Sequence, residues 1–326
     1  TFGNDDLVAV KTHFGEPGST TFLRPQFVGA VVDMVRQGGG KPFLTDSNTL
    51  YKGGRSNAVD HLNAAVRHGY TYPVIDAPAI IADGLLGKDE VEVDVNLKHC
   101  RTVKFGAAAQ QASSIIVVSH FKGHLMTGFG GALKNLGMGF GSRAGKLEMH
   151  RLAHPKVDRE ICTGCGACST SCPQSAIAVE GKADIKSEDC IGCGECWVAC
   201  PSDAIGPQDP QSLVDIQEKI VEYCYGILKG KKDRVGYMTF VVDVTPHCDC
   251  PGWSQWPSTR PPPTSSTAPG GWRGRSSRTT SLRERIRSEH WSTSIGPFSY
   301  DMLKSSAWDP ESTSSSNYRH VYILQE

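Results

Sequence analysis

Eight of the twelve cysteines fall into two runs that share one spacing. The first run reads CTGCGACSTSCP from Cys162 to Pro173, and the second reads CIGCGECWVACP from Cys190 to Pro201. Both have the form C-x2-C-x2-C-x3-C-P, by which bacterial ferredoxins hold pairs of iron-sulfur clusters. In that arrangement the first three cysteines of a run bind one cluster and the fourth binds the other. The chemistry that this spacing predicts is the transfer of single electrons.

The spacing therefore predicts two [4Fe-4S] clusters, each held by cysteines from both runs. The predicted ligands of cluster 1 are Cys162, Cys165, Cys168 and Cys200. The predicted ligands of cluster 2 are Cys172, Cys190, Cys193 and Cys196. A pair of zinc sites is the alternative, but all-cysteine zinc sites usually join two C-x2-C halves across a longer loop.

The residues between and after the cysteines suit the same role. The glycines there let the backbone curl around a cluster and direct N–H groups at its sulfurs. They are Gly164, Gly166, Gly192 and Gly194. Pro173 and Pro201 are predicted to begin short helices, because proline is favoured in the first turn. The Ala-Ile pair after each run, at 176–177 and 204–205, is predicted to form an apolar wall around the clusters.

A second group of chemically capable residues follows the apolar run SSIIVVSHF, at the position where open α/β sheets bind ligands. The predicted catalytic residues, which would bind an anionic ligand or supply a proton, are His120, Lys122, His124 and Lys134. Further side chains are expected in the same cleft, namely Asn135, Arg143, Lys146 and His150. The many glycines here have two interpretations: close approach to a ligand, or tight turns and helix packing. The stretch contains no P-loop, and GFGSRA at 139–144 lacks the preceding apolar strand that a dinucleotide site requires.

Polar residues also follow two earlier predicted strands, where they are either ligand contacts or turn caps. They are Lys11, His13, Glu16 and Arg24 after the first strand, and Asp46, Asn48 and Arg55 after the second. His61 and His68 lie on a predicted helix and are interpreted as surface or half-buried residues.

Three more potential ligands, His247, Cys248 and Cys250, follow a later apolar strand. They could bind a third metal or form a redox thiol pair, or the cysteines could be inert and buried. Cys100 and Cys224 are interpreted as core or surface thiols.

These residues require a scaffold, and the chain predicts an α/β fold. Apolar runs at 7–14, 41–46 and 113–121 alternate with amphipathic helical stretches, which favours a mixed or parallel sheet covered by helices. A helix after the cysteine runs and an apolar strand near 234–244 continue this pattern. The predicted organisation is an α/β domain at 1–154 and 208–253 that carries a two-cluster, bacterial-ferredoxin-like α+β module at 155–207.

Bulk composition limits the partners. Lys plus Arg and Asp plus Glu are each 34, so there is no net charge to attract nucleic acid. No apolar run is long enough for a membrane span. We therefore expect no nucleic-acid partner. We expect the partner to be a redox protein or a small-molecule electron acceptor. Because the paired cysteine runs have the spacing of metal ligands, we expect a reducing, cytoplasmic compartment.

The motifs together resemble one family. They include VKTHFGEPG, KPFLTDSNTLY, APAIIADG, HFKGH, TGFGGALKNLGMG, SRAGKLEMH and the double cysteine run, and they span about residues 5 to 253. They are similar to the iron-sulfur members of the family called domain of unknown function 362. The resemblance implies an α/β domain with a two-cluster ferredoxin module, and it implies no defined reaction.

The tail at 254–326 departs from that family and is rich in Ser, Thr, Pro and Arg, which predicts disorder. Back-translated and read two bases later, residues 302–314 give a sequence similar to the usual ending of the family. A frameshift is therefore the alternative explanation of the tail.

The leading interpretation is an electron-transfer protein, possessing or serving an oxidoreductase site near residues 120–150. The alternatives are a ferredoxin-like carrier and a redox-sensing or structural iron-sulfur protein without turnover.

Overall fold

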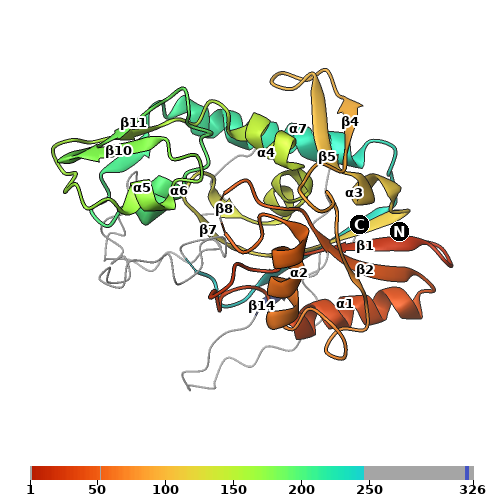
Figure 1. Cartoon of the computed structure of the whole chain (residues 1–326). Coiled ribbons are helices and arrows are strands. Elements are labelled where there is room, and N and C mark those ends of the chain that lie inside the picture. The colour runs from red at the N-terminus through yellow and green to blue at the C-terminus, as the bar shows by residue number, and fades with distance from the viewer. Residues whose placement is uncertain (1, 52, 246–319, 323–326) are drawn as a thin grey trace, which may run out of the picture. The chain divides into compact units, whose positions relative to one another are not determined.

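The structure, a computed structural model, describes residues 2–51, 53–245 and 320–322. Its centre is a six-stranded sheet with the strand order β14-β13-β6-β1-β2-β3 (Figure 1). The strands are β1 (Leu7–Lys11), β2 (Lys41–Asp46), β3 (Ala79–Ile81), β6 (Ser114–His120), β13 (Val235–Val241) and β14 (His320–Tyr322). All neighbours are parallel except β14, which pairs antiparallel with β13 at one edge. The prediction of a mixed α/β fold with a mostly parallel sheet is confirmed.

Helices cover both faces of the sheet, because its inner strands are apolar on both sides. On one face, Val8 and Val10 of β1 pack with Val28 and Val32 of α1 (Pro25–Gln37). On the other face, Ala9 belongs to the cluster that includes residues of α7 (Gln211–Leu228). Figure 1 shows α1 and α7 on opposite sides of β1 and β2.

Local sequence signals fix the helix ends. Pro25 begins α1, in the first turn, where a missing N–H costs little. The Oδ1 atom of Asn57 accepts a hydrogen bond from the N–H of Asp60 and so caps α2 (Ala58–Arg67). The smaller helical elements are α3 (Ala107–Gln111), α4 (Arg143–His150) and η1, a stretch of π-helix (Lys134–Met138).

Two antiparallel hairpins flank the sheet. The strands β4 (Glu90–Asp94) and β5 (Thr102–Gly106) form one of them, and β7 (Lys122–His124) and β8 (Gly128–Gly130) form the other. The first hairpin was not predicted from the sequence. The second carries two of the predicted catalytic residues.

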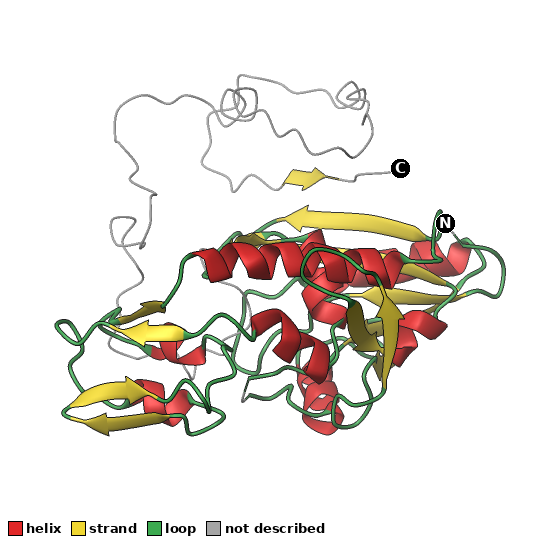
Figure 2. Cartoon of the chain, turned by 90° about the horizontal axis from the view of Figure 1, so that it is seen from above, coloured by secondary structure: helices red, strands yellow, loops and turns green. Residues whose placement is uncertain are grey.

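The segment with the cysteine runs has its own short elements and its own apolar cluster. Its strands are β9 (Pro155–Val157), β10 (Ile177–Glu180), β11 (Lys182–Ile185) and β12 (Ile205–Pro207), and its helices are α5 (Ala167–Ser171) and α6 (Glu195–Ala199). Strand β9 pairs with β12, and β10 pairs with β11 (Figure 2). The chain leaves this segment directly into α7.

Most of the tail, 254–326, lies outside the described residues, as do His247, Cys248 and Cys250. Within that tail His320–Tyr322 forms β14. Among the described residues, no helix combines the length and the apolar composition that crossing a membrane requires.

Candidate functional site

A cavity of about 160 Å³ lies at the carboxyl ends of the parallel strands. Strands β2 and β3 lie on one side of β1 in the sheet. The later strands β6 and β13 lie on the other side of β1, so the strand order reverses there. Ligands of open α/β sheets bind at such a reversal of strand order. Lys11 at the end of β1, Asp46 at the end of β2 and His120 at the end of β6 all line the cavity.

The four predicted catalytic residues, His120, Lys122, His124 and Lys134, all line this one cavity. The other predicted cleft residues that line it are Lys11, His13, Asp46, Arg55, Asn135, Lys146 and His150. The structure therefore brings together residues that lie more than one hundred positions apart in the sequence.

Four of the predicted contacts lie elsewhere. The guanidinium of Arg143 donates a hydrogen bond to the carbonyl of Ser56. Arg24 is exposed and forms an ion pair with Asp243. Glu16 and Asn48 are buried one layer behind the lining: Glu16 pairs with Arg55, and Asn48 donates to the Asp83 carboxylate.

The floor of the cavity is a buried ionic network. Lys11 Nζ lies 2.9 Å from Asp46 Oδ1, and Arg55 Nη1 lies 3.3 Å from Asp46 Oδ2. Arg55 Nε also lies 2.9 Å from Glu16 Oε2. Burial would raise the pKa of Asp46, but Lys11 and His61 reverse that effect and hold it well below the ordinary value. Asp46 is therefore a carboxylate at neutral pH.

Asn135 connects this network to η1. Its Oδ1 atom accepts a hydrogen bond from Lys11 Nζ at 2.9 Å, and its Nδ2 group donates to Val118 O and Ser119 Oγ, each at 3.0 Å. A Cβ atom on Gly139 would lie 2.6 Å from Lys11 Nζ, so a larger residue there would displace the end of the lysine side chain. π-Helical turns of this kind are frequent at functional sites.

The glycines of this stretch are explained largely by packing. A Cβ atom on Gly137 would lie 2.3 Å from Ile220 O of α7, and one on Gly145 would lie 2.1 Å from Lys104 O. These close backbone contacts support the packing interpretation of the glycines over nucleotide binding.

Lys146 and Asp83 are buried groups with displaced pKa values. Burial lowers the pKa of Lys146 to about 8, partly offset by Asp83 and Asp46. Burial raises the pKa of Asp83 to about 6 although Lys146 opposes the change. Both values lie close to neutrality, the range in which a group can exchange protons during a reaction.

The hydrogen bonds of three histidines determine which ring nitrogen carries the proton of the neutral ring. His124 Nδ1 accepts from the N–H groups of Met126 and Thr127, each at 3.2 Å, so the proton is on Nε2. His120 Nε2 donates to Val242 O at 2.6 Å, and His150 Nδ1 donates to Lys146 O at 2.8 Å. Burial lowers the pKa of His150 to about 4, so its ring is neutral at pH 7.

His61 corrects a prediction made from the sequence. It is fully buried, and its Nε2 atom lies 3.5 Å from Asp46 Oδ2. Burial lowers the pKa of His61 to about 4, so the neutral ring packs beneath the network. The interpretation of His61 as a surface or half-buried residue was wrong because its face of α2 points to the charged floor. His68 is half-buried, as predicted, and stacks on Phe22 with ring centroids 4.1 Å apart.

The lining of the cavity also has an apolar part, here called the apolar wall, which was not predicted. It includes Leu50, Leu125, Met126, Met138, Val198, Ile216 and Ile220. Ile216 and Ile220 come from α7, and Val198 comes from α6. Cys193, Gly194 and Glu195 of the second cysteine run also line the cavity. The cavity thus borders both the sheet and the cysteine segment.

The cysteines themselves gather around two smaller cavities. One is lined by Cys162, Cys165, Cys168 and Cys200, and the other by Cys172, Cys190, Cys193 and Cys196. Each set contains three cysteines of one run and the last cysteine of the other run. Four sulfur donors around one space are a suitable set for an iron-sulfur cluster. No disulfide joins any of the described cysteines.

Backbone N–H groups are directed at several of these sulfurs. Ala176 N lies 3.3 Å from Cys172 Sγ, and Ala204 N lies 3.2 Å from Cys200 Sγ, at equivalent positions after the two runs. Donors of this kind stabilise the negative charge of metal-bound thiolates. The alanines and isoleucines at 176–177 and 204–205 line the same two cavities.

The glycines in the runs have the left-handed backbone conformation, which glycine adopts readily. The φ angles of Gly164, Gly166, Gly192 and Gly194 are 69°, 78°, 67° and 80°. The prediction for the prolines was wrong. The short helices α5 and α6 end before Pro173 and Pro201, so each proline follows a helix end, where it prevents continuation.

Burial raises the pKa of several thiols in the second set. The pKa of Cys193 rises to about 12, and burial together with the neighbouring thiols also raises the pKa of Cys196. A bound cation reverses this preference, because metal-coordinated thiols lose their protons. Cys100 and Cys224 are buried away from both sets, and Cys224 Sγ donates to Leu133 O.

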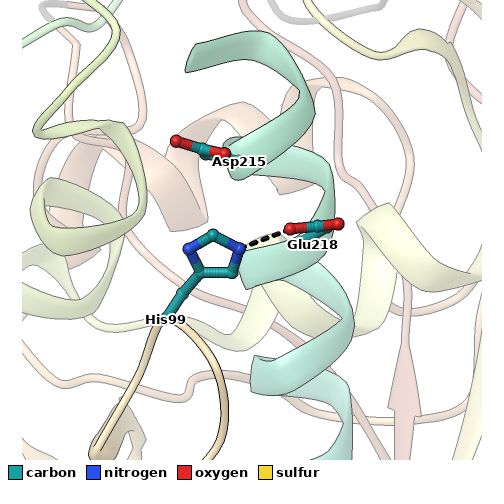
Figure 3. A group of neighbouring side chains, drawn as sticks. All are labelled: His99, Asp215 and Glu218. Carbon is teal, nitrogen blue, oxygen red and sulfur yellow. Dashed lines mark hydrogen bonds and ion pairs between the residues drawn. The ribbon is translucent and has the colours of Figure 1, made fainter. Parts of the chain in front are cut away.

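A separate group of potential ligands consists of His99, Asp215 and Glu218 (Figure 3). Glu218 already binds His99 and lies 2.6 Å from Lys98 Nζ. The N–H groups of His99 and Cys100 donate to the Glu222 carboxylate. These contacts attach the loop after β4 to α7, and we interpret the group as structural.

Comparisons with known proteins place the chain in a family. No curated protein matches it. The solved structure of the lactate racemase apoprotein from Thermoanaerobacterium thermosaccharolyticum is similar, with 11% sequence identity and a TM-score of 0.41. That likeness covers 74% of this chain and 43% of the racemase chain, so this chain spans less than half of its length. A family model matches residues 8–262, and the chain therefore belongs to the family described as domain of unknown function DUF362.

Proposed function

We propose that this chain is an iron-sulfur electron-transfer protein that forms an oxidoreductase or a component of one. Residues 155–207 would be a ferredoxin-like module with two [4Fe-4S] clusters, inserted between the parts of the α/β domain at 1–154 and 208–253. When bound, such clusters accept and release single electrons. A reducing, cytoplasmic compartment suits this function, because it keeps the cysteines available as ligands.

One observation carries the proposal: the cavity at the sheet is also lined by Cys193, Gly194 and Glu195 of the second cysteine set. A ligand in that cavity would lie beside the predicted site of cluster 2. The same cavity contains His120, Lys122, His124 and Lys134, which suit the binding of an anion and the transfer of a proton.

The residues have separable tasks in this proposal. Lys122 and Lys134 would attract and orient the ligand. His124 would donate a hydrogen bond from Nε2, since its Nδ1 atom is an acceptor. Lys146, with a pKa of about 8, would exchange a proton with the ligand. The apolar wall, including Ile216 and Ile220, would exclude water.

A plain electron carrier is the second candidate, and one observation favours it. The first cysteine cavity is lined only by residues between Cys162 and Ile205, and Cys165 is exposed. A redox partner protein could therefore approach that side of the segment directly. A carrier would use the α/β domain for docking rather than for turnover.

Anaerobic reconstitution followed by iron and sulfide counting tests the proposal. We expect about eight irons and eight sulfides per chain, and a paramagnetic resonance signal that appears on reduction. A redox titration would then give the potentials. A colourless protein, or one that binds zinc instead, would contradict the proposal.

A further inference from the structure

We infer that the cavity at the carboxyl ends of β1, β2 and β6 binds a small organic monocarboxylate with an apolar body. This inference names the ligand class of the proposed oxidoreductase site and so rests on the proposed function. It follows from the charges, the apolar wall and the size of the cavity.

Cationic side chains are the commoner charged groups in the lining of the cavity. Five cationic side chains line the cavity, namely Lys11, Arg55, Lys122, Lys134 and Lys146, together with the carboxylates of Asp46 and Glu195. Two more carboxylates act on this set from behind, since Glu16 pairs with Arg55 and Asp83 attracts Lys146. Cations thus outnumber the carboxylates by one among these described side chains, before the negative charge of a loaded cluster beside Cys193 is counted.

Lys134 is not part of the ionic network on the floor of the cavity. Lys11 and Arg55 are already engaged with Asp46 and Glu16. Lys134 is half-buried, and no hydrogen bond or ion pair joins it to another described residue. A lysine that lines a cavity without a protein acceptor is a suitable donor to a ligand carboxylate.

The apolar wall requires a ligand that is more than an ion. Leu125 and Met126 approach from the β7–β8 hairpin, and Ile216 and Ile220 approach from α7. Contact with these side chains is favourable only for apolar ligand surface. A small hydrated anion would leave the wall in contact with water.

The volume of the cavity limits the size of the apolar part of the ligand. The cavity measures about 160 Å³. An engineered cavity of about 150 Å³ with apolar walls binds benzene, so one six-membered ring fits a space of this size. The apolar part of the lining favours a carboxylate with a ring over inorganic phosphate, which has no apolar surface to bury.

Calorimetric titration of the iron-loaded protein without oxygen tests the inference, with benzoate, benzamide, acetate and inorganic phosphate as probes. We expect benzoate to bind at least about tenfold more tightly than each of the other three, because only benzoate offers both the single charge and the ring. Benzamide or acetate binding as tightly as benzoate would overturn the inference. Tighter binding of phosphate than of benzoate would indicate that the cavity binds an oxyanion of higher charge. That result would also overturn the inference.

Two variants with the same change of charge locate the binding. Lys134→Gln is expected to weaken benzoate binding about tenfold and to leave benzamide unchanged. Lys186→Gln, at an exposed lysine of the cysteine segment, is the control and should retain full affinity. Equal losses in both variants would show a nonspecific effect of charge and would refute the assignment.

The iron count separates this inference from the proposed function. Benzoate binding by a chain that cannot be loaded with iron would support the ligand class while the electron-transfer proposal fails. A protein that is fully loaded with iron but does not bind benzoate would refute the inferred ligand class and leave the electron-transfer proposal intact.

Discussion

Lys11 Nζ and Asp46 Oδ1 lie 2.9 Å apart at the carboxyl ends of two adjacent parallel strands, and both side chains are buried. The pair joins β1 to β2 at the point where the cavity begins. Arg55 and His61 complete its surroundings, each facing the second oxygen of the same carboxylate. The site is therefore organised around one negative charge that the fold encloses.

Asp46→Asn tests the importance of that charge. The variant leaves Lys11 without its carboxylate in a buried position, and breaking a buried pair from one side costs about 3–5 kcal/mol. We expect a fall of that size in the free energy of unfolding, measured by chemical denaturation. Asp76→Asn is the matched control, because it breaks the exposed pair with Arg36. That control should cost less than about 1 kcal/mol, and equal losses would contradict the role given to burial.

His61 makes stability depend on pH. Its pKa is about 4 in the folded chain because burial disfavours the charged ring, compared with 6.5 ordinarily. Between these values the unfolded chain binds a proton that the folded chain does not, so stability is lost as the pH falls from about 6.5 towards 4. The full effect of this histidine is about 3 kcal/mol.

His61→Gln should therefore flatten the dependence of unfolding free energy on pH in that window, by up to about 1.4 kcal/mol per pH unit. Denaturation series at several pH values measure the slope. Asn63→Gln, at an exposed position of the same helix, should keep the slope of the unmodified protein. An unchanged slope in His61→Gln would mean that the buried ring does not titrate as stated.

Much of the fold could be predicted from the sequence, because its central strands are apolar runs that alternate with amphipathic helices. The run at 113–121 became β6, and the stretch after Pro210 became α7. The β4–β5 hairpin was missed although Val91 and Val93 alternate with acidic residues in β4. Short half-exposed strands give weak signals, because few of their side chains reach the core.

The site could be predicted only in part. Lys11, Asp46 and His120 follow apolar strands, and parallel strands bring their carboxyl ends to one edge of the sheet. The apolar wall depends on how α7 and the cysteine segment pack against that edge, which no local pattern in Ile216 or Val198 reveals. The burial of His61 was missed for the same reason, since it depends on the tertiary position of α2.

Double variants test the predicted exchange of cysteines between the two runs. If Cys200 shares a cluster with Cys165, then Cys165→Ser with Cys200→Ser removes one cluster, and about four irons remain. The combination of Cys165→Ser with Cys172→Ser then removes both clusters. Iron and sulfide counting after anaerobic reconstitution measures the difference. The reverse pattern would show that each run binds its own cluster.

Glycine-to-alanine changes test the packing of η1 against α7. Gly137→Ala places a methyl group 2.3 Å from Ile220 O, and we expect a loss of about 1–3 kcal/mol in unfolding free energy because neither backbone can move easily. Gly29→Ala in α1 is the control, since the nearest atom lies 3.6 Å away. Alanine is the better helix former, so the control should gain about 0.5–1 kcal/mol. Equal effects of the two changes would contradict the close contact.

Gly192 connects the second cysteine run to the end of α4. A Cβ atom there would lie 2.4 Å from His150 O and 3.2 Å from Ala153 O. Gly166 has a similar left-handed conformation, with a φ angle of 78° compared with 67°, but a Cβ atom there would meet nothing within 4 Å. The two substitutions by alanine thus share the backbone strain, about 1–2 kcal/mol, and differ in the contact.

We expect Gly192→Ala to lower the melting temperature more than Gly166→Ala, because only Gly192→Ala forces the cysteine segment away from α4. The displacement should also disturb Cys190 and Cys193, which flank Gly192 in the second set. Iron counting should therefore find fewer irons in Gly192→Ala and a nearly full complement in Gly166→Ala. Melting curves and iron counts that are the same for both variants would show that the segment does not depend on this contact, and the border between the cavity and the second cysteine set would then need another explanation.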